Sequence, residues 1–379
     1  MATTPVALAD AATPGDPTQP GHRAAQPRPT IIELRFGQGL QVAAGDGGSS
    51  LQVRAFVRAR QSLTDPKGAP TAEALVRNAQ LRFSGHALRP GLTWRIQLGL
   101  SPTEMAINGY RLLQTALVRY TWTTGWSVAA GRAKVPYGAQ RLAHSSELQF
   151  TDLSATVQEL HLDRTSGIFV QSPAENRADV SGVVAGNSPG FLAGVRARLR
   201  PLGAFDDTVE GDVARSPRLR VALAGSLVSA VDNLSTQVTR GEVYPEAWTQ
   251  TFHTALDFTV KYKGFSLHSE WMSRQAKGDS AYLDLGHKVV RVWSRSAYGA
   301  HLQLGQMVNP WVQVAARMAR LRRMDGTDPA LRSVDELAAA VTAHLRGDDF
   351  KVQLEIVDLF SGDFRDGMVT LRGQVALFW

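Results

Sequence analysis

The chain has 379 residues, with 34 arginines against seven lysines, no cysteine and a formal net charge of +7. It has no run of about 18 uncharged apolar residues, which excludes membrane-spanning helices. Without thiols, disulfide scaffolds and thiolate metal sites are excluded as well. The arginine surplus has two explanations, a GC-rich codon habit or contacts with anions such as phosphate, and composition does not decide between them.

The first thirty residues form a region of their own. Residues 1–30 contain six prolines among Ala, Thr, Gly and Gln and almost nothing apolar to bury, which predicts a disordered tail. A basic n-region and an apolar h-region are missing, although Ala7-Leu8-Ala9 before Asp10 has the small-x-small form of a cleavage site. The tail is therefore compatible with a truncated signal remnant. Residues 31–50 are expected to be a periplasmic segment before the first strand.

From residue 51 onward, apolar and polar residues alternate along the chain. In Leu51–Arg60, for example, odd positions are apolar, while even positions include Arg54, Arg58 and Arg60. Strict alternation places one face of a strand in an apolar medium and the other in a polar one. The pattern predicts sixteen strands, at about 51–61, 76–87, 92–100, 112–122, 126–134, 165–173, 178–186, 191–200, 217–229, 250–262, 264–274, 292–305, 310–322, 335–346, 350–360 and 367–379.

The connections between these strands alternate between short and long. Turn residues such as Arg89-Pro90-Gly91 and Lys263-Gly264 make the short ones, and long ones fall near 62–75, 101–111, 135–164, 230–249, 275–291 and 323–334. Tight turns at one end and longer loops at the other are typical of a bacterial outer-membrane barrel. We therefore predict an all-β, antiparallel 16-stranded transmembrane β-barrel over 51–379. Because the number of strands is even, the first strand begins and the last strand ends on the same side of the membrane.

The segment 333–347 tests this interpretation, because its D-E-L-A-A-A-V-T-A-H-L-R run favours a helix by propensity. Alternation and the clear turn and strand that follow predict a strand instead. A soluble β-sandwich is the alternative for the whole pattern. Strands of about 9–13 residues and a chain that ends on Phe378-Trp379 favour the membrane barrel. An interfacial aromatic girdle also accounts for Trp94, Trp122, Trp126, Trp248, Trp271, Trp293 and Trp311.

One stretch resembles a known family. Residues 131–142 read GRAKVPYGAQRL and residues 145–152 read SSELQFTD. They are similar to the strand end and following loop of the phosphate-selective porin O/P family. Asp163-Arg164-Thr165-Ser166-Gly167 resembles the family's R-D-x-G-V stretch with acid and base inverted, and the resemblance covers nearly all of 37–379. It implies a homotrimeric outer-membrane channel in a Gram-negative bacterium, with 135–164 as a constriction loop folded into the lumen. An extracellular flap packed outside the pore remains the alternative for that loop.

Strand parity, that is, whether a residue occupies an odd or an even position along its strand, then identifies candidate pore-lining residues. If the apolar face meets lipid, the alternating arginines point into the lumen, because a charge facing lipid near the midplane costs about 2–4 kcal/mol. Arginines in a pore concentrate anions, and their guanidinium groups match phosphate or carboxylate oxygens. The predicted pore-lining, anion-binding residues are Arg54, Arg58, Arg60, Arg82, Arg95, Arg196, Arg198, Arg218, Arg220 and Arg372.

Lys134 and Arg141, both on the family-like stretch, are the constriction candidates. The resemblance implies a lysine cluster at the constriction of phosphate-selective members, whereas here only Lys134, Lys261 and Lys351 are placed to reach the lumen. Anion preference is therefore the main prediction, and phosphate selectivity the finer one. Pairing of the arginines with lumenal acids such as Asp257, Glu270 and Glu355 would instead leave little net field.

Other classes of function receive little support. The nine histidines show no His-Glu-x-x-His spacing, and no Gly-x-Ser-x-Gly or P-loop motif occurs, so we expect no enzyme, no metal and no cofactor. Basic residues alternate along many strands instead of clustering, which argues against nucleic-acid binding. The expected partners are small anions, outer-membrane lipid and lipopolysaccharide, and further copies of the chain. A barrel that mainly anchors or scaffolds other envelope proteins is the alternative function.

Overall fold

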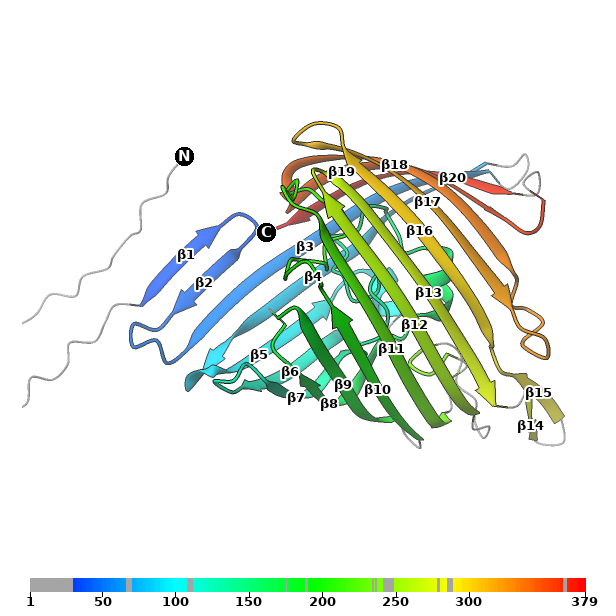
Figure 1. The fold of residues 1–379 in the computed structure, drawn as a ribbon, viewed down its shortest axis with the longest axis horizontal. Helices are drawn as coiled ribbons and strands as arrows, with labels where there is room; N and C mark the ends of the chain where they lie inside the picture. The colour runs from blue at the N-terminus through cyan, green and yellow to red at the C-terminus, as the bar shows by residue number, and fades with distance from the viewer. Residues whose placement is uncertain are drawn as a thin grey trace, which may run out of the picture.

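The computed structural model describes residues 30–65, 70–107, 112–174, 176–187, 190–233, 235, 237–240, 249–277, 280–284, 289–363 and 367–379. The predicted tail lies outside the described residues, except for Thr30. Almost all the described secondary structure is antiparallel β-sheet (Figure 1). Among the described residues, the helices are too short and too polar to cross a membrane.

Sixteen strands make up the barrel, and the sheet closes because the last strand pairs with the first, with Phe378 opposite Phe56. The 16-stranded antiparallel barrel predicted from the sequence is thus confirmed, with most strand bounds within a few residues. The strands are β3 (Ser50–Asp65), β4 (Thr71–Ala87), β5 (Arg89–Gly99), β6 (Leu113–Thr121), β7 (Ser127–Lys134), β8 (Arg164–Gln171), β9 (Ala178–Asn187), β10 (Gly190–Leu199), β11 (Arg220–Asn233), β12 (Thr249–Tyr262), β13 (Phe265–Lys277), β16 (Ala297–Met307), β17 (Val312–Arg323), β18 (Val334–Asp348), β19 (Phe350–Phe360) and β20 (Met368–Phe378).

The two ends of the barrel differ in their connections. We call the end where β3 begins and β20 ends the terminus end, and the opposite end the loop end. Most terminus-end connections are tight, such as the β12–β13 turn, where Lys263 and Gly264 both have positive φ (49° and 90°), as a two-residue hairpin turn requires. One connection contradicts the expected pattern of tight turns at this end. Residues 200–219, between β10 and β11, form a long segment.

Several shorter elements lie outside the sixteen strands. The segment before the barrel forms a hairpin of β1 (Ile31–Arg35) and β2 (Gly39–Ala43), and β2 pairs with the start of β3. The long connection after β13 contains a second hairpin, β14 (Ser280–Asp284) and β15 (Val289–Trp293), so β16 begins at Ala297 and not near residue 292. Two short helices, α1 (Pro102–Ile107) and α2 (Ala155–Leu160), lie in loop-end connections.

The segment that tested the fold prediction is a strand. β18 runs from Val334 to Asp348 and pairs with β17 on one side and β19 on the other, in spite of its helix-forming residues. Pairing along both edges satisfies the backbone of every residue that it engages, and it outweighs a propensity difference of a few tenths of a kcal/mol per residue.

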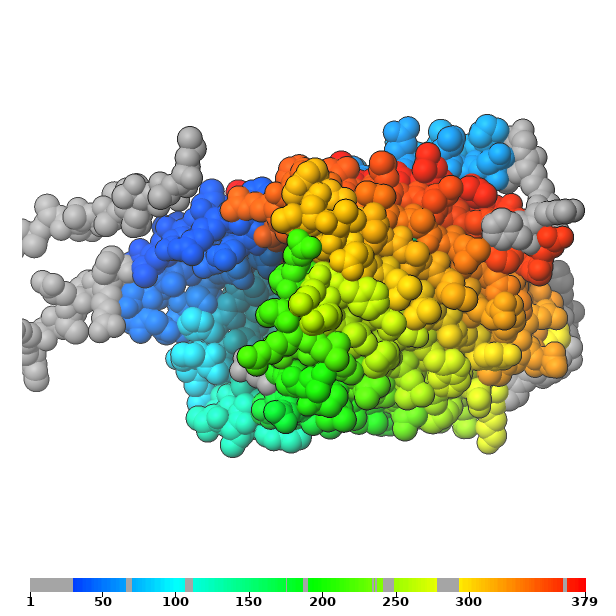
Figure 2. All heavy atoms as spheres, turned by 45° about the horizontal axis from the view of Figure 1, so that its top comes forward, coloured from blue at the N-terminus to red at the C-terminus, as the bar shows by residue number. Residues whose placement is uncertain are grey.

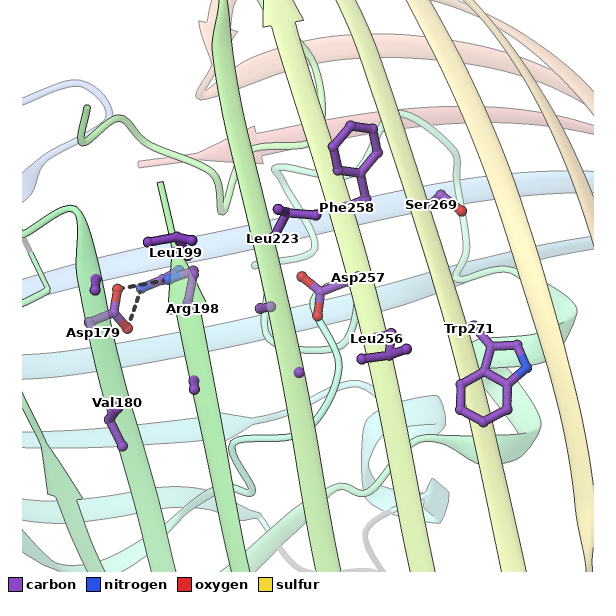
Figure 3. Close-up of a pocket in the computed structure, with 14 residues that line it drawn as sticks. Asp179, Val180, Arg198, Leu199, Leu223, Leu256, Asp257, Phe258, Ser269 and Trp271 are labelled. Atoms are coloured by element: carbon purple, nitrogen blue, oxygen red, sulfur yellow. Dashed lines mark hydrogen bonds and ion pairs between the residues drawn. The ribbon is translucent and has the colours of Figure 1, made fainter. Parts of the chain in front are cut away.

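The outer face of the barrel is apolar and the inner face polar. On β19, Leu354 is 60% exposed whereas the next residue, Glu355, is 1% exposed, and on β12 the pair Leu256 and Asp257 shows the same contrast (61% and 8%). A depression between β9 and β13 is lined mostly by aliphatic and aromatic side chains (Figure 3), among them the exposed Val180, Leu199, Leu223, Leu256 and Trp271. The alternation therefore turns aliphatic groups outward.

Aromatic residues gather at the terminus end. Trp122 and Trp126 flank the β6–β7 turn, Trp311 lies in the β16–β17 turn and Trp379 ends the chain, and all four are exposed. Such a ring of amphipathic side chains is typical of a membrane interface. Trp248 lies outside the described residues.

Candidate lumenal site

Inner-face arginines of β3 and β20 reach the connection between β7 and β8, residues 135–163. Arg58 is buried and donates a hydrogen bond to the Thr151 carbonyl at 2.9 Å. Arg60 donates to the same carbonyl at 2.8 Å and forms an ion pair with Asp152 at 2.6 Å. Arg372 approaches Asp152 more distantly, at 4.0 Å. These three predicted residues therefore bind part of the chain itself.

The arginines of β10 are paired with carboxylates. Arg196 makes a two-pronged contact with Asp257, at 2.5 and 2.8 Å, and both side chains are buried. Arg198 contacts both oxygens of Asp179, at 2.9 and 3.2 Å (Figure 3). Arg200, which continues the same alternation, lies 2.6 Å from Asp179. On this wall, most of the positive charge is neutralised by neighbouring acids.

A different situation holds on the wall formed by β3–β6. We call Arg54, Arg82, Arg95 and Arg119, one from each of these four neighbouring strands, the arginine stripe. Register places Arg54 directly opposite Arg82. Arg95 lies opposite Ser84, two residues along β4 from Arg82, and Arg119 lies opposite Thr93, two residues along β5 from Arg95. Arg54 lies 3.8 Å from Asp349, and Arg119 donates to Ser127 and Gln171, which are neutral. For Arg82 and Arg95, the described part of the chain offers no carboxylate within ion-pair distance.

The two remaining predicted arginines lie near the start of β11. Arg220 is its first residue, is partly buried and makes long contacts of 3.5 Å with the carbonyls of Leu202 and Ala204. Arg218 is exposed and precedes the strand. The structure thus places Arg218 in the connection at the terminus end, outside the barrel strands.

Lys134 and Arg141 hold the beginning of the 135–163 connection in place. The Lys134 ammonium donates to three successive carbonyls of residues 141–143, at 2.7, 3.1 and 2.9 Å. Arg141 forms an ion pair with Asp163 at 2.5 Å, next to Arg164 at the start of β8. Both cations therefore fix the fold of the connection, and the Lys134 ammonium is fully engaged by the carbonyls.

The 135–163 connection packs as a small core of its own. Tyr137, Phe150 and Leu160 are fully buried, and the Tyr137 hydroxyl donates to the Thr254 carbonyl on β12 at 2.8 Å. Helix α2 begins after Ser154, whose hydroxyl accepts from the Val157 amide at 3.2 Å as an N-cap does. Figure 1 shows this segment behind the strands of the front wall.

Hydrogen bonds tie the connection to inner-face side chains of the wall from β17 to β19. The backbone amides of Thr151 and Ala155 donate to Glu355 and Glu336, respectively, at 2.6 Å each. Glu336 also pairs with Arg317 at 2.5 Å, and Arg317 donates to the Asp152 carbonyl at 3.0 Å. Ionised groups that meet backbone amides and carbonyls form the stronger class of hydrogen bond, so this wall anchors the connection.

The ionisable groups of the connection respond to burial and to neighbouring arginines. Burial alone would raise the pKa of Asp152, but Arg60 and Arg77 outweigh burial and hold this pKa well below its usual range. The pKa of Asp163 is likewise held low, because Arg141 outweighs burial. Both carboxylates are therefore charged at neutral pH, and the ion pairs that anchor the connection are intact.

One group of inner-face side chains has the chemistry of metal ligands. The ligand atoms of His268, Glu270 and His301 lie within 4.8 Å of one another. All three have protein partners, because His268 Nδ1 and His301 Nε2 are 3.0 Å apart, His301 Nδ1 is 3.1 Å from the Ser154 hydroxyl, and Glu270 accepts two backbone amides. The cluster is thus satisfied as a hydrogen-bonded network.

Strand parity, applied more widely, also identifies lumenal residues that were not among the candidates. Arg119 and Arg317 lie on the inner faces of β6 and β17, and Arg200, directly after β10, continues the alternation of Arg196 and Arg198. By contrast, no pattern in the sequence indicates Glu210, which lies in the 200–219 connection and contacts both the 135–163 connection and Gln303 on β16.

The chain matches one known family, and its fold is similar to several solved structures. A model of the family described as phosphate-selective porin O and P matches residues 51–286. No curated protein matches the sequence. The fold is similar to the anion-selective porin of Comamonas acidovorans (TM-score 0.61, 11% identity, 87% of this chain and 100% of that chain). It is also similar to OmpF of Salmonella typhi in complex with daunomycin (0.56, 13%, 88% and 98%) and to a trimer form of Vibrio cholerae OmpT (0.52, 10%, 88% and 100%).

A closed 16-stranded barrel with an apolar outer face and a polar inner face defines an outer-membrane porin, a channel protein of the Gram-negative envelope. The family match then specifies which porin. This chain belongs to the phosphate-selective porin O and P family.

Proposed function

We propose that this porin allows small anions to diffuse passively through a bore that is lined on one side by the arginine stripe. The observation that carries the proposal is the state of Arg82 and Arg95. Both side chains are on the inner face, and in the described residues neither has a carboxylate within ion-pair distance. Arg95 is exposed although it faces inward, so solvent-accessible space adjoins it.

Electrostatics favours anions at this wall. Like charges placed directly opposite each other on neighbouring strands, as Arg54 and Arg82 are, destabilise a sheet unless solvent or counterions screen them. A mobile anion supplies that screening, and guanidinium groups bind phosphate or carboxylate oxygens in pairs. Several weak sites in series let an anion enter without trapping it. We therefore assign the anion path to the stripe. A smaller share of the field is assigned to the ion-paired Arg60, Arg196, Arg198 and Arg372, to Arg58 and Arg220, which donate to carbonyls, and to the exposed Arg218.

We further propose that the 135–163 connection is the constriction loop. Its anchors lie on β17–β19 and on Arg60 of β3 and Arg77 of β4, whereas in the described residues no hydrogen bond or ion pair joins it to Arg82 or Arg95, so its bulk would leave the bore beside these two arginines. Lys134 and Arg141 would then shape the narrow region mainly by holding the loop together. Phosphate preference is the finer proposal, which the family description supports and the scarcity of lysine weakens. A homotrimer in contact with lipopolysaccharide is the assembly we propose, on the analogy of the OmpT trimer form.

The proposal is tested by the reversal potential of the purified protein in planar bilayers under a potassium chloride gradient. We expect single channels whose reversal potential is displaced toward the chloride equilibrium potential. Replacing chloride with phosphate on one side then measures how strongly phosphate is preferred. A cation-selective channel, or a correctly folded protein that does not conduct, would contradict the proposal.

A further inference from the structure

The connection between β10 and β11, residues 200–219, crosses the terminus end of the barrel. It is coloured green in Figures 1 and 2. Near its start, Asp207 pairs with Arg200 at 3.0 Å, and further along Asp212 accepts a hydrogen bond from the Gly264 amide, in the β12–β13 turn, at 2.7 Å. At Gly211 an added Cβ would lie 2.6 Å from the side-chain amide nitrogen of Gln313 on β17, so the segment approaches this strand closely. The segment therefore spans from β10 to β17 and is fixed along its length.

Glu210, just before the closest approach to β17, meets the 135–163 connection, which enters from the opposite end of the barrel. The Glu210 amide donates to the Glu147 carbonyl at 3.2 Å. Its carboxylate accepts from the Gln140 side chain at 2.9 Å and from the Gln149 backbone amide at 2.7 Å. The same carboxylate accepts from the side chain of Gln303, on β16, at 2.8 Å. One side chain thus joins two connections and the barrel wall.

The hydrogen-bond roles in this network are fully determined. The Gln140 amide nitrogen faces Glu210, while its oxygen accepts from the Ser154 amide at 2.9 Å, at the start of α2. Gln140 therefore cannot be flipped without losing the contact that begins the helix. Gln149 and Gln303 likewise present donors to Glu210. Burying a carboxylate is unfavourable unless donors surround it, and here three donors converge on its two oxygens.

We propose that residues 200–219 form a second lumenal segment, and that Glu210 is a positioning residue that fixes the 135–163 connection against the wall. This inference rests on the proposed function only for its consequence, a bore of constant width. We call the set of hydrogen bonds that Glu210 makes with Gln140, Gln149 and Gln303 the clamp, and its existence does not depend on conduction. It assigns to a single carboxylate the role of holding together chain segments that enter from opposite ends of the barrel.

A reciprocal exchange of side chains tests the clamp. In Glu210→Gln, the new side-chain NH2 group faces an N–H donor in either orientation, because Gln140, Gln149 and Gln303 all donate to this position. Two donors that face each other make no hydrogen bond. In Gln140→Glu, two carboxylates face each other. The double variant E210Q/Q140E restores the match, since the new amide at position 210 donates to the new carboxylate at position 140. The other oxygen of that carboxylate still accepts from the Ser154 amide, and the charge of the network is the same as in the parent.

The measurement is amide hydrogen exchange of peptides covering residues 140–151, in the detergent-solubilised protein, with heat-modifiable gel migration as the check that the barrel is folded. We expect each single variant to speed exchange at Gln149 about tenfold and the double variant to restore protection. Open-channel current noise should rise and fall in parallel.

Two outcomes overturn the clamp: unchanged exchange in folded E210Q, or a double variant that exchanges as fast as the single ones. Hydrogen exchange does not depend on conduction, so the two proposals fail separately. Rescue of exchange in a protein that conducts no anions would support the clamp and refute the proposed function. An anion-selective channel with unchanged exchange in E210Q would do the reverse.

Discussion

Replacing Leu354 by arginine should lower the free energy of unfolding from lipid bilayers by about 2–4 kcal/mol. Leu354 lies in the middle of β19, opposite Val341 and Gly373 on the neighbouring strands, and is 60% exposed on the outer face. If that face meets acyl chains, the variant transfers a guanidinium group into hydrocarbon near the midplane. The measurement is denaturant unfolding of the protein reconstituted in phospholipid vesicles.

The matched control is Leu354→Met, which keeps the volume and the apolar character and should cost less than about 1.5 kcal/mol. A water-exposed leucine tolerates arginine with little change in stability. A Leu354→Arg variant as stable as Leu354→Met would therefore show that the outer face of β19 is not in contact with lipid.

Reversing the charge of two members of the arginine stripe should abolish anion selectivity. In the double variant R82E/R95E, the stripe changes from four positive charges to two of each sign, and the new carboxylates lie beside Arg54 and Arg119. The anion-to-cation permeability ratio depends exponentially on the electrostatic potential in the bore. We therefore expect this ratio to fall on the order of tenfold. The reversal potential in a salt gradient measures this change.

The control for net charge is Arg332→Glu, at an exposed position in the β17–β18 connection of the loop end. It should shift the reversal potential far less than either single variant of the stripe. An R82E/R95E channel with the selectivity of the parent would place the anion path elsewhere, for example beside the paired arginines of β10.

Local periodicity was sufficient to predict the barrel. A period of two is imposed on every strand that separates lipid from water. The approximate bounds of the sixteen barrel strands, and the side of the strand on which Leu354 or Arg58 lies, can therefore be derived from the sequence. The same rule identified β18 in spite of its helix propensity. The β14–β15 hairpin is not part of the barrel wall, so no boundary between lipid and water requires its residues to alternate, and the sequence did not predict it.

The paths of the 135–163 and 200–219 connections could not be derived in this way, because they depend on contacts between residues far apart in the chain. Glu210 meets Gln303, and Thr151 meets Glu355, across 93 and 204 residues, respectively. Parity showed that Arg58 and Arg196 face inward, but not which inward arginines pair with acids. That distinction depends on register and loop path, and it separates Arg82 and Arg95 from Arg60, Arg196, Arg198 and Arg372, which pair with acids.

The central claim, that aliphatic side chains face lipid while arginines line a watery bore, is tested most directly by spin labelling. Because the chain has no cysteine, single cysteines at positions 92–98 of β5 can each carry one label. In reconstituted protein, labels at 92, 94, 96 and 98 should collide mainly with oxygen, and those at 93, 95 and 97 mainly with a water-soluble nickel complex. The opposite phase, or equal access of the nickel complex to all seven positions, would contradict this account.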